Sequence, residues 1–213
     1  MLIQCDFDGT IIRNNLSVLL RENFAQGDWR QIEDAYMQRS LTVEESNRQQ
    51  YRLIYQSREK LQAFVCQHIE LRPGFIEFVS YCQQENIPFV IVSSGVDFYI
   101  KAVLDRIGMS HLEHHCGRGV FYGDGISVQY FGPEGNLLDG GFKSRFLTWL
   151  RQRDSSIIYL GDGYSDIEPA RQAEHVLATG MLPDLLKAES VATTAFDDFY
   201  EVISEVKRLS QQY

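Results

Sequence analysis

Two aspartates near the start of the chain, Asp6 and Asp8, are spaced so that they share one face of a strand. They follow the short apolar run at 2–5, and side chains two residues apart on a strand point the same way. Two carboxylates held so close repel one another unless a cation lies between them or one of them is protonated. Gly9 then allows a sharp turn, and Thr10 adds a hydroxyl. This pattern predicts a metal-assisted site with a carboxylate nucleophile.

Three further polar segments follow predicted buried strands or begin predicted helices. They are Ser93-Ser94-Gly95, Lys143, and Asp162 with Asp166. Ligands of open α/β sheets bind at the carboxyl ends of the strands. A carboxylate can attack phosphorus to form an aspartyl-phosphate, a lysine is a point charge suited to phosphate, and hydroxyl and N–H groups at a helix start bind anions. Because Mg²⁺ prefers oxygen ligands, the whole set suits phosphoryl transfer.

Several of these residues also have a purely structural interpretation. Asp6 and Asp8 are compatible with a turn at the end of a strand, but burying two acids without a partner is costly, which favours a functional role. Ser93 alone is compatible with a helix cap. Lys143 alone is compatible with a solvated helix residue, and Arg145 is the rival for its role; the usual contact of lysine with phosphate favours Lys143.

The fourth segment also has a structural interpretation, and two other segments resemble functional sites. Asp166 is compatible with a helix N-cap, and Ser165 begins a capping-box pattern with Glu168. Residues 123–125 imitate the glycine–aspartate pattern of the fourth segment, but they lie between two alternating strands and are predicted as a hairpin turn. Residues 114–116, two histidines and a cysteine, lack a second cluster at ligand spacing, so a zinc site is not favoured.

The elements that position these residues alternate between strands and helices. Strands are predicted at 2–6, 87–92, 156–160 and 175–178, with a hairpin at 119–122 and 126–130. Helices are predicted at 75–85 and from about residues 97, 142 and 197. This alternation predicts an α/β fold with a Rossmann-like, mostly parallel sheet and helices on both faces.

The segment between the first strand and residue 72 has only helical patterns. Apolar residues recur at helical spacing from Leu16 to Phe24, and Thr42 with Glu45 forms a capping-box pattern. We therefore expect a helical cap that is inserted after the first strand and lies over the carboxyl ends of the strands. The predicted domains are a core of residues 1–13 and 72–213 and a cap of residues 14–71.

Composition limits the partners. Among 213 residues, 44% are hydrophobic, which suits a packed core, and the net charge of -9 disfavours nucleic acid and anionic membranes. No signal-peptide pattern or membrane-length apolar run is present. The four cysteines are scattered, which favours reduced thiols in a cytoplasmic protein; they are Cys5, Cys66, Cys82 and Cys116. We expect a small phosphorylated metabolite as partner and a monomer or homodimer.

The four segments in order resemble the motifs of the haloacid dehalogenase superfamily of phosphatases, over essentially the whole chain. The matching motifs are 6–10, 92–95, Lys143 and 161–166. The resemblance implies that Asp6 is the nucleophile and Asp8 the general acid/base. It implies a Mg²⁺ ion held by Asp6, the backbone carbonyl of Asp8 and Asp162, with Asp166 in support. The implied phosphate-binding residues are Gly9, Thr10, Ser93, Ser94, Gly95 and Lys143.

The position of the cap resembles the phosphoserine phosphatase branch of that superfamily. A closer resemblance is to the phosphatases of methionine salvage that act on an enol phosphate, in the segments 72–75, 87–89, 93–98 and 198–201. Phosphoserine phosphatases have a substrate-binding glutamate nine residues after the nucleophile, where this chain has Asn15. The cysteine-rich segment of Bacillus-type salvage enzymes is also missing before Phe142.

The resemblance therefore implies a Mg²⁺-dependent phosphomonoesterase, with the methionine-salvage enol phosphate as the first substrate candidate. Phosphoserine and phosphocholine or phosphoethanolamine are the alternatives, as is an inactive binding module of the same fold. Because Asp8 is present, phosphoryl chemistry is favoured over dehalogenation. We expect the cap to present aromatic and apolar side chains that suit a neutral leaving group. Its aromatic residues Trp29, Tyr36, Tyr51 and Tyr55 mainly pack, and its arginines Arg39, Arg48, Arg52 and Arg58 mostly form a solvated face, with one or two toward the substrate.

Overall fold

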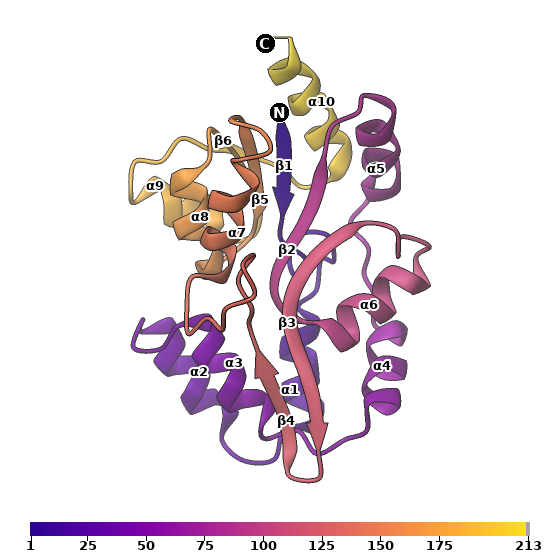
Figure 1. Ribbon diagram of the computed structural model, residues 1–213, viewed down its shortest axis with the longest axis vertical. Coiled ribbons are helices and arrows are strands. Elements are labelled where there is room, and N and C mark those ends of the chain that lie inside the picture. The colour runs from indigo at the N-terminus through magenta and orange to yellow at the C-terminus, as the bar shows by residue number, and fades with distance from the viewer. Residues whose placement is uncertain (212–213) are drawn as a thin grey trace.

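A seven-stranded, mostly parallel sheet forms the centre of the protein, as the computed structural model of residues 1–211 shows (Figure 1). The strands are β1 (Leu2–Cys5), β2 (Phe89–Val96), β3 (Glu113–Tyr122), β4 (Gly125–Gln129), β5 (Ile157–Gly161), β6 (His175–Ala178) and β7 (Thr194–Ala195). Their order is β4-β3-β2-β1-β5-β6-β7, and β4 alone runs antiparallel to its neighbour in this sheet. The predicted α/β fold with a Rossmann-like sheet is confirmed.

Helices cover both faces of the sheet. Those after the cap are α5 (Phe75–Gln84), α6 (Asp97–Arg106), α7 (Phe142–Leu150), the 3₁₀ turn η1 (Tyr164–Asp166), α8 (Ile167–Gln172), α9 (Leu182–Lys187) and α10 (Phe199–Ser210). Figure 1 shows α5 and α6 on one side of the sheet and α7 and α8 on the other. The chain runs outward from β1 to β3, then returns to β5 on the opposite side of β1. Right-handed crossovers in opposite directions place their helices on opposite faces.

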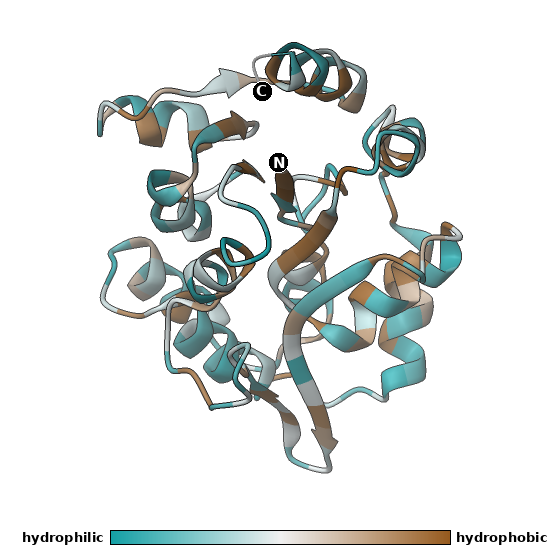
Figure 2. Ribbon diagram, turned by 45° about the horizontal axis from the view of Figure 1, so that its top comes forward, coloured by the Kyte–Doolittle hydropathy of each residue, from teal (hydrophilic) through white to brown (hydrophobic). Residues whose placement is uncertain are grey.

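The core lies between the sheet and these helices. Every residue of β1, β2 and β5 is buried, and Figure 2 shows hydrophobic colour along β1 and β2. Parallel strands that are covered on both faces are continuously apolar, which is why the sequence predicts them well. At the upper end of the molecule, Phe78 packs edge-on against Phe89 at 5.3 Å and beside Phe199 at 5.0 Å, which joins α5, β2 and α10.

The cap consists of four short helices beyond the carboxyl end of β1, in the lower part of Figure 1. They are α1 (Leu16–Phe24), α2 (Trp29–Met37), α3 (Val43–Tyr51) and α4 (Arg58–Gln67). Each begins at a polar N-cap whose side chain accepts a backbone N–H bond; these residues are Asn15, Asp28, Thr42 and Ser57. The predicted capping box is present, because Glu45 Oε2 also accepts from the Thr42 N–H at 2.8 Å.

The β3–β4 hairpin extends from the edge of the sheet to the cap. Its turn lies at 123–124, within the predicted segment 123–125. However, β3 begins at Glu113, so residues 114–116 belong to a strand that the sequence did not predict. A Cβ on Gly125 would lie 2.3 Å from the carbonyl oxygen of Arg52, so only glycine allows this approach. Arg58 of the cap donates to the carbonyl of Gly119 at 3.2 Å. The hairpin therefore braces the cap helices.

Two further elements were missed by the sequence prediction. The short helix α9 and the two-residue strand β7 carry too little periodicity to be recognised, and β7 exists through its pairing with β6. The predicted capping box at Ser165 is wrong, because Ser165 Oγ accepts from Lys143 Nζ at 2.9 Å and Glu168 pairs with Arg171 at 3.1 Å. Within residues 1–211, no helix combines the length and apolarity that a membrane crossing requires.

Candidate active site

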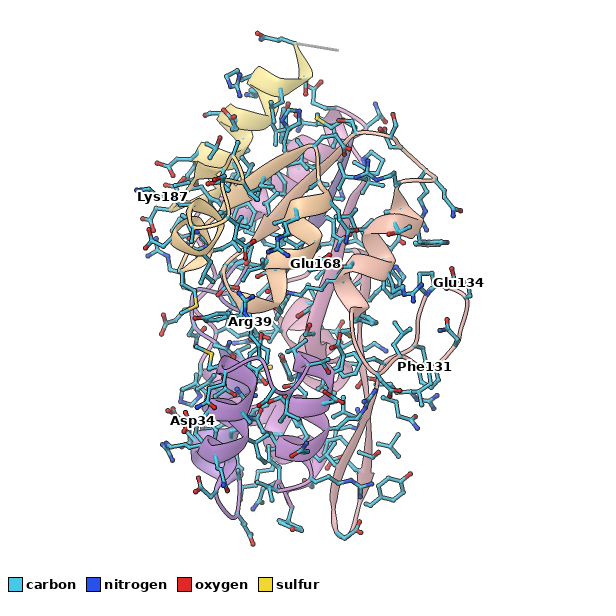
Figure 3. All side chains as sticks on the ribbon, turned by 90° about the vertical axis from the view of Figure 1, so that its left-hand side faces the viewer. Asp34, Arg39, Phe131, Glu134, Glu168 and Lys187 are labelled. Carbon is cyan, nitrogen blue, oxygen red and sulfur yellow. The ribbon has the colours of Figure 1, made fainter. Side chains whose placement is uncertain are left out.

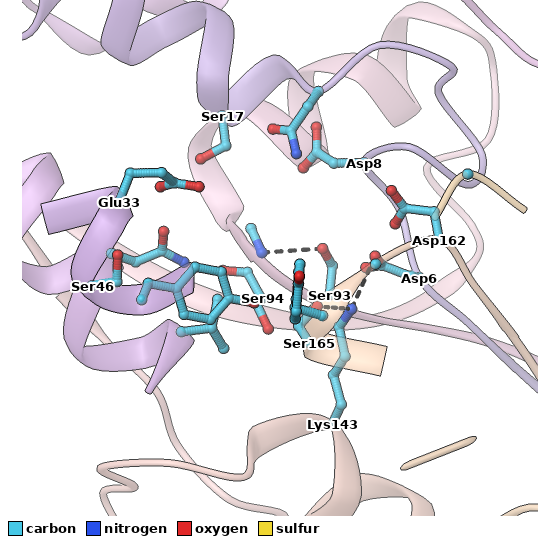
Figure 4. A pocket seen from close by; sticks show the side chains of 18 of the residues that line it. Asp6, Asp8, Ser17, Glu33, Ser46, Ser93, Ser94, Lys143, Asp162 and Ser165 are labelled. Carbon is cyan, nitrogen blue, oxygen red and sulfur yellow. Dashed lines mark hydrogen bonds and ion pairs between the residues drawn. The ribbon is translucent and has the colours of Figure 1, made fainter. Parts of the chain in front are cut away.

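A cavity of about 440 Å³ lies between the carboxyl ends of the strands and the cap. Its floor comes from the segments after β1 and β5, from β2 and from the first turn of α7, and its opposite wall comes from α1, α2 and α3 (Figure 4). The chain adds strands on one side of β1 up to β4 and then on the other side from β5 onward, so the strand order reverses between β1 and β5. Such switch points are where α/β proteins bind ligands. The predicted site residues Asp6, Asp8, Ser93, Lys143 and Asp162 all line this cavity.

Asp6 and Lys143 form a buried ion pair at the floor of the cavity. Lys143 Nζ lies 2.9 Å from Asp6 Oδ2 and 2.6 Å from Asp166 Oδ1. Burial raises the pKa of Asp6 to about 6, against the opposing effect of Lys143, and Asp166 adds to the rise. Burial alone would lower the pKa of Lys143, but the Asp166 and Asp6 carboxylates outweigh it and raise that pKa. Lys143 therefore remains a cation, and Arg145, its rival in the sequence, is exposed.

Asp8 is held from two sides. Its Oδ1 accepts the backbone N–H of Leu16, the first residue of α1, at 2.8 Å, and its Oδ2 accepts the hydroxyl of Tyr99 at 2.5 Å. A Cβ on Gly95 would lie 2.1 Å from that hydroxyl, so the glycine makes room for Tyr99. Burial raises the pKa of Asp8, which favours the protonated form that a proton donor needs.

Asp166 is completely buried, and both of its oxygens already accept hydrogen bonds. Oδ1 accepts from Lys143 and from the hydroxyl of Tyr159 at 2.5 Å. Oδ2 accepts from the backbone N–H groups of Asp162 and Gly163, both at 2.9 Å. Asp166 thus fixes the loop after β5 and the ammonium of Lys143 at the same time.

Asp162 has a carboxylate without a hydrogen-bond donor among residues 1–211. Burial raises its pKa, and the nearby Asp166 and Asp6 raise it further. Oxygens of Asp6, Asp162 and Asp166 lie within 4.8 Å of one another. An unpaired, half-buried carboxylate beside two buried ones is unfavourable without a cation, and an all-oxygen donor set suits Mg²⁺. The arrangement therefore fits the predicted magnesium ion.

The predicted phosphate-binding residues divide into two groups. Ser93, Ser94 and Gly95 line the cavity, and the buried hydroxyl of Ser94 has no partner among the described residues. Gly9 and Thr10 do not line it. Gly9, at φ +76°, lies against Asp162, and Thr10 is fully buried behind the site. The structure thus places Gly9 and Thr10 in the wall that supports the site.

Arg72 supports that wall and was not predicted as a site residue. Its guanidinium donates to the carbonyls of Thr10 and Gly9, both at 2.6 Å, and to the carbonyl of Asp197 at 2.8 Å. It therefore holds the turn after β1 in position from behind. The sequence contained one indication, because Arg72 opens a segment, 72–75, that supports the family resemblance.

The cap wall of the cavity differs from the prediction. The expected aromatic and apolar side chains are present in part, as Tyr36, Met37 and Val43. A buried arginine, Arg21, and Glu33 also line the wall, and we did not expect them. Helical periodicity identifies a buried face but not which part of that face borders a cavity. Figure 4 shows Ser17 and Glu33 across from the aspartates.

The arginines predicted to form a solvated face do not line the cavity. Arg48 pairs with Asp139 at 3.2 Å, and Arg39 lies 3.9 Å from Glu189 at the boundary between the cap and the core (Figure 3). These pairs dock the cap on the core. The expectation that one or two of the four arginines face the substrate is therefore wrong.

Fold and site together define a hydrolase with a carboxylate-rich centre at the switch point of a parallel sheet. The sequence profile of the family described as haloacid dehalogenase-like hydrolase matches residues 3–171. The chain therefore belongs to this family, and it is a phosphatase. The family resemblance seen in the sequence is confirmed.

The similar proteins include phosphatases of two kinds. A protein of Brevibacillus brevis, named 2-hydroxy-3-keto-5-methylthiopentenyl-1-phosphate phosphatase, is 27% identical over 216 residues that cover 100% of this chain and 97% of the relative. A protein of the same name from Bacillus mycoides is 29% identical, and the match covers 96% of this chain and 95% of the relative. A substrate-bound phosphoserine phosphatase structure matches with a TM-score of 0.71 at 18% identity and covers 96% and 97%. At 18% identity, the similarity to the phosphoserine phosphatase structure concerns the fold alone.

Proposed function

We propose that the protein is a Mg²⁺-dependent phosphomonoesterase that forms an aspartyl-phosphate on Asp6. The observation that carries this proposal is the arrangement around Asp6. Its carboxylate lies 2.9 Å from the Lys143 ammonium and close to the unpaired carboxylate of Asp162. A nucleophile, a phosphate-binding cation and a candidate metal ligand thus share the floor of one cavity.

The residues of the chain account for both half-reactions. Lys143 and the segment from Ser93 to Gly95, which lines the cavity, bind the phosphate oxygens, and Asp6 attacks phosphorus. A bond forms between the Asp6 oxygen and phosphorus while the ester bond breaks, and Asp8 gives its proton to the departing oxygen. Asp8 then accepts a proton from a water molecule, whose oxygen attacks phosphorus. Inorganic phosphate leaves, and the carboxylate of Asp6 is restored.

The carboxylates of Asp6 and Asp162 and the backbone carbonyl of Asp8 are the proposed holders of Mg²⁺. When bound, Mg²⁺ supplies positive charge that offsets the charges of the phosphate and the carboxylates. Asp166, which we predicted as a metal residue, has both oxygens occupied by donors. Its proposed contribution is therefore to position Lys143 and the backbone of Asp162.

The proposed substrate is the enol phosphate of methionine salvage. Relatives of that name match nearly the whole chain. Met37 on the cap and Met181 on the core, 39% and 47% exposed, both line the cavity, and they offer an apolar surface for a methylthio tail. Asn15 accepts the Val18 N–H as the cap of α1, and its neutral amide lacks the charge that would pair with the ammonium of phosphoserine. Phosphoserine and phosphocholine or phosphoethanolamine are therefore ranked second.

Specificity constants measured with Mg²⁺ test both parts of this proposal. p-Nitrophenyl phosphate reports general phosphatase activity, and the enol phosphate, phosphoserine and phosphocholine are compared with it. Asp6→Asn should lose turnover by about three orders of magnitude or more, whereas Asp105→Asn, an exposed aspartate on α6, serves as the matched control. Full activity in excess chelator, or in Asp6→Asn, would refute the mechanism. A preference for phosphoserine would refute only the proposed substrate and would leave the proposed mechanism intact. The cytoplasmic location and the monomeric or homodimeric state stay predictions.

A further inference from the structure

Arg21 is a buried cation in the cap wall whose hydrogen-bonding capacity is only partly used. It lies on α1, lines the cavity and is 4% exposed. Its Nη1 donates to Ser17 Oγ at 2.7 Å, and its Nη2 lies 3.5 Å from Glu33 Oε2. Its Nε is buried and has no partner among residues 1–211. Buried donors are normally paired, so the guanidinium, which belongs to a residue that lines the cavity, has hydrogen-bonding capacity that the described residues leave unused.

The pairing of Arg21 with Glu33 does not by itself explain this arrangement. At 3.5 Å the contact is at the long limit for a hydrogen bond, and Glu33 Oε2 accepts a shorter bond of 2.7 Å from Gln50 Nε2. A buried ion pair is also a poor source of stability, because removing two charges from water costs about as much as their attraction returns. Glu33 therefore orients the guanidinium and balances its charge without satisfying all of its donors.

The position of Arg21 relates it to the departing oxygen. Asp8, the proposed proton donor, is bound to the N–H of Leu16, and Ser17 is the next residue along α1. The Arg21 side chain runs back toward the start of the helix, because its guanidinium contacts Ser17 one turn earlier. The guanidinium therefore lies near the first turn of α1, which also supplies the Leu16 N–H group bound to Asp8. Arg21 and Asp8 both line the cavity, so a ligand that fills it can contact both side chains.

We propose that Arg21 is a specificity-determining residue that selects phosphate esters with an uncharged carbonyl or enol oxygen on the carbon next to the phosphate-bearing carbon. This inference rests on the proposed phosphatase function. Arg21 offers donors to such an oxygen, and Glu33 makes the wall neutral overall, which disfavours a second anionic group. Because Arg21 and Glu33 together carry no net charge, the wall also gives no net attraction to a leaving group with an ammonium.

Two three-carbon esters isolate this contact. Hydroxyacetone phosphate has a ketone next to the phosphate-bearing carbon, and propyl phosphate is the same ester with only hydrogen there. The wild-type ratio of their kcat/KM values should favour the ketone about tenfold or more, since a buried donor left unpaired discriminates against the analogue that lacks the acceptor. Arg21→Met should reduce this ratio about tenfold. Arg30 is an exposed arginine of the same cap, and both Arg21 and Arg30 lie over the ring of Trp29. Arg30→Met is therefore the matched control, and it should leave the ratio of the two kcat/KM values unchanged.

The outcomes separate this inference from the proposed function. Arg21→Met protein with the wild-type ratio would overturn the role of Arg21 and leave the phosphatase mechanism intact. If the unpaired Glu33 destabilises that variant in thermal melts, Arg21→Met/Glu33→Met removes both charges and is assayed in its place. Wild-type protein that does not distinguish the two esters, or prefers phosphoethanolamine, would also overturn the inference. Protein that hydrolyses none of these esters and no p-nitrophenyl phosphate would refute the proposed function, and this inference with it.

Discussion

Gly9→Ala tests whether the position of Asp162 decides metal binding. Gly9 follows Asp8 at a backbone φ of +76°, and an added Cβ would lie 2.0 Å from Oδ2 of Asp162. Ordinary contacts begin at 3.4 Å, so the carboxylate has to withdraw by more than an ångström. Bonds from Mg²⁺ to oxygen are about 2.0–2.1 Å and tolerate deviations of only about 0.2 Å. The displaced carboxylate therefore cannot keep its place as a ligand.

The expected magnitude has two parts. The left-handed backbone costs an alanine about 1–2 kcal/mol, which lowers the melting temperature by about 2–4 °C for each kcal/mol in a chain of this size. The displaced ligand should cost about 100-fold in kcat/KM at limiting Mg²⁺, because a shift of about 1 Å at a reacting centre has an effect of that order. The half-saturating Mg²⁺ concentration should rise about tenfold or more.

Gly108→Ala is the matched control. Gly108 has nearly the same φ, +75°, but a Cβ there would meet nothing within 4 Å. Both variants therefore have the backbone strain, and only Gly9→Ala also has the collision with Asp162. The assay is hydrolysis of p-nitrophenyl phosphate over a series of Mg²⁺ concentrations, with thermal melts of both variants. Equal activity and equal Mg²⁺ dependence in the two variants would refute the reasoning.

Three further perturbations test the proton donor and the contact between cap and core. Tyr99→Phe removes the hydroxyl that holds Asp8, so kcat should fall about tenfold for an alkyl phosphate and less for p-nitrophenyl phosphate, whose leaving group needs no proton; equal losses would contradict the positioning role. Asp8→Asn should accumulate phosphoenzyme in rapid-quench experiments, and unchanged turnover would count against it. Burial raises the pKa of Glu44, which accepts the N–H of Phe142, above 4.5, so wild-type stability should fall relative to Glu44→Gln as pH rises from about 4 to about 7. A constant difference in melting temperature would exclude that effect.

The strands and the polar segments that line the cavity were predictable because their patterns are local. A buried parallel strand such as β5 is apolar throughout, and a carboxylate directly after it is visible without knowledge of the fold. The parallel pairing of β1 with β5, with Cys5 opposite Leu160, then brings Asp6 beside the start of the segment that contains Asp162. The first half of β3 was missed because it is polar and half-buried, so its pairing with β2 identifies it better than its own sequence does.

The cap wall was the least predictable part of the site. Arg21 and Glu33 are on different helices, α1 and α2, and neither helix by itself indicates that the two side chains meet at the cavity. An arginine is usually exposed in soluble proteins, so its burial is a property of the packing between helices. The same holds for Tyr99, which reaches Asp8 from α6 across 91 positions of the chain.

The sequence by itself determined the α/β fold, the place of the cap after the first strand, and the residue types of the proposed catalytic centre. These follow from periodicity and from short motifs, in which the interacting features are close together along the chain. Only the tertiary structure decided that Asp166 has both oxygens occupied, that Thr10 lies behind the site, and that a buried arginine lines the cap wall. The physical reason is that hydrogen-bond partners and burial depend on groups from distant segments, which local sequence does not specify.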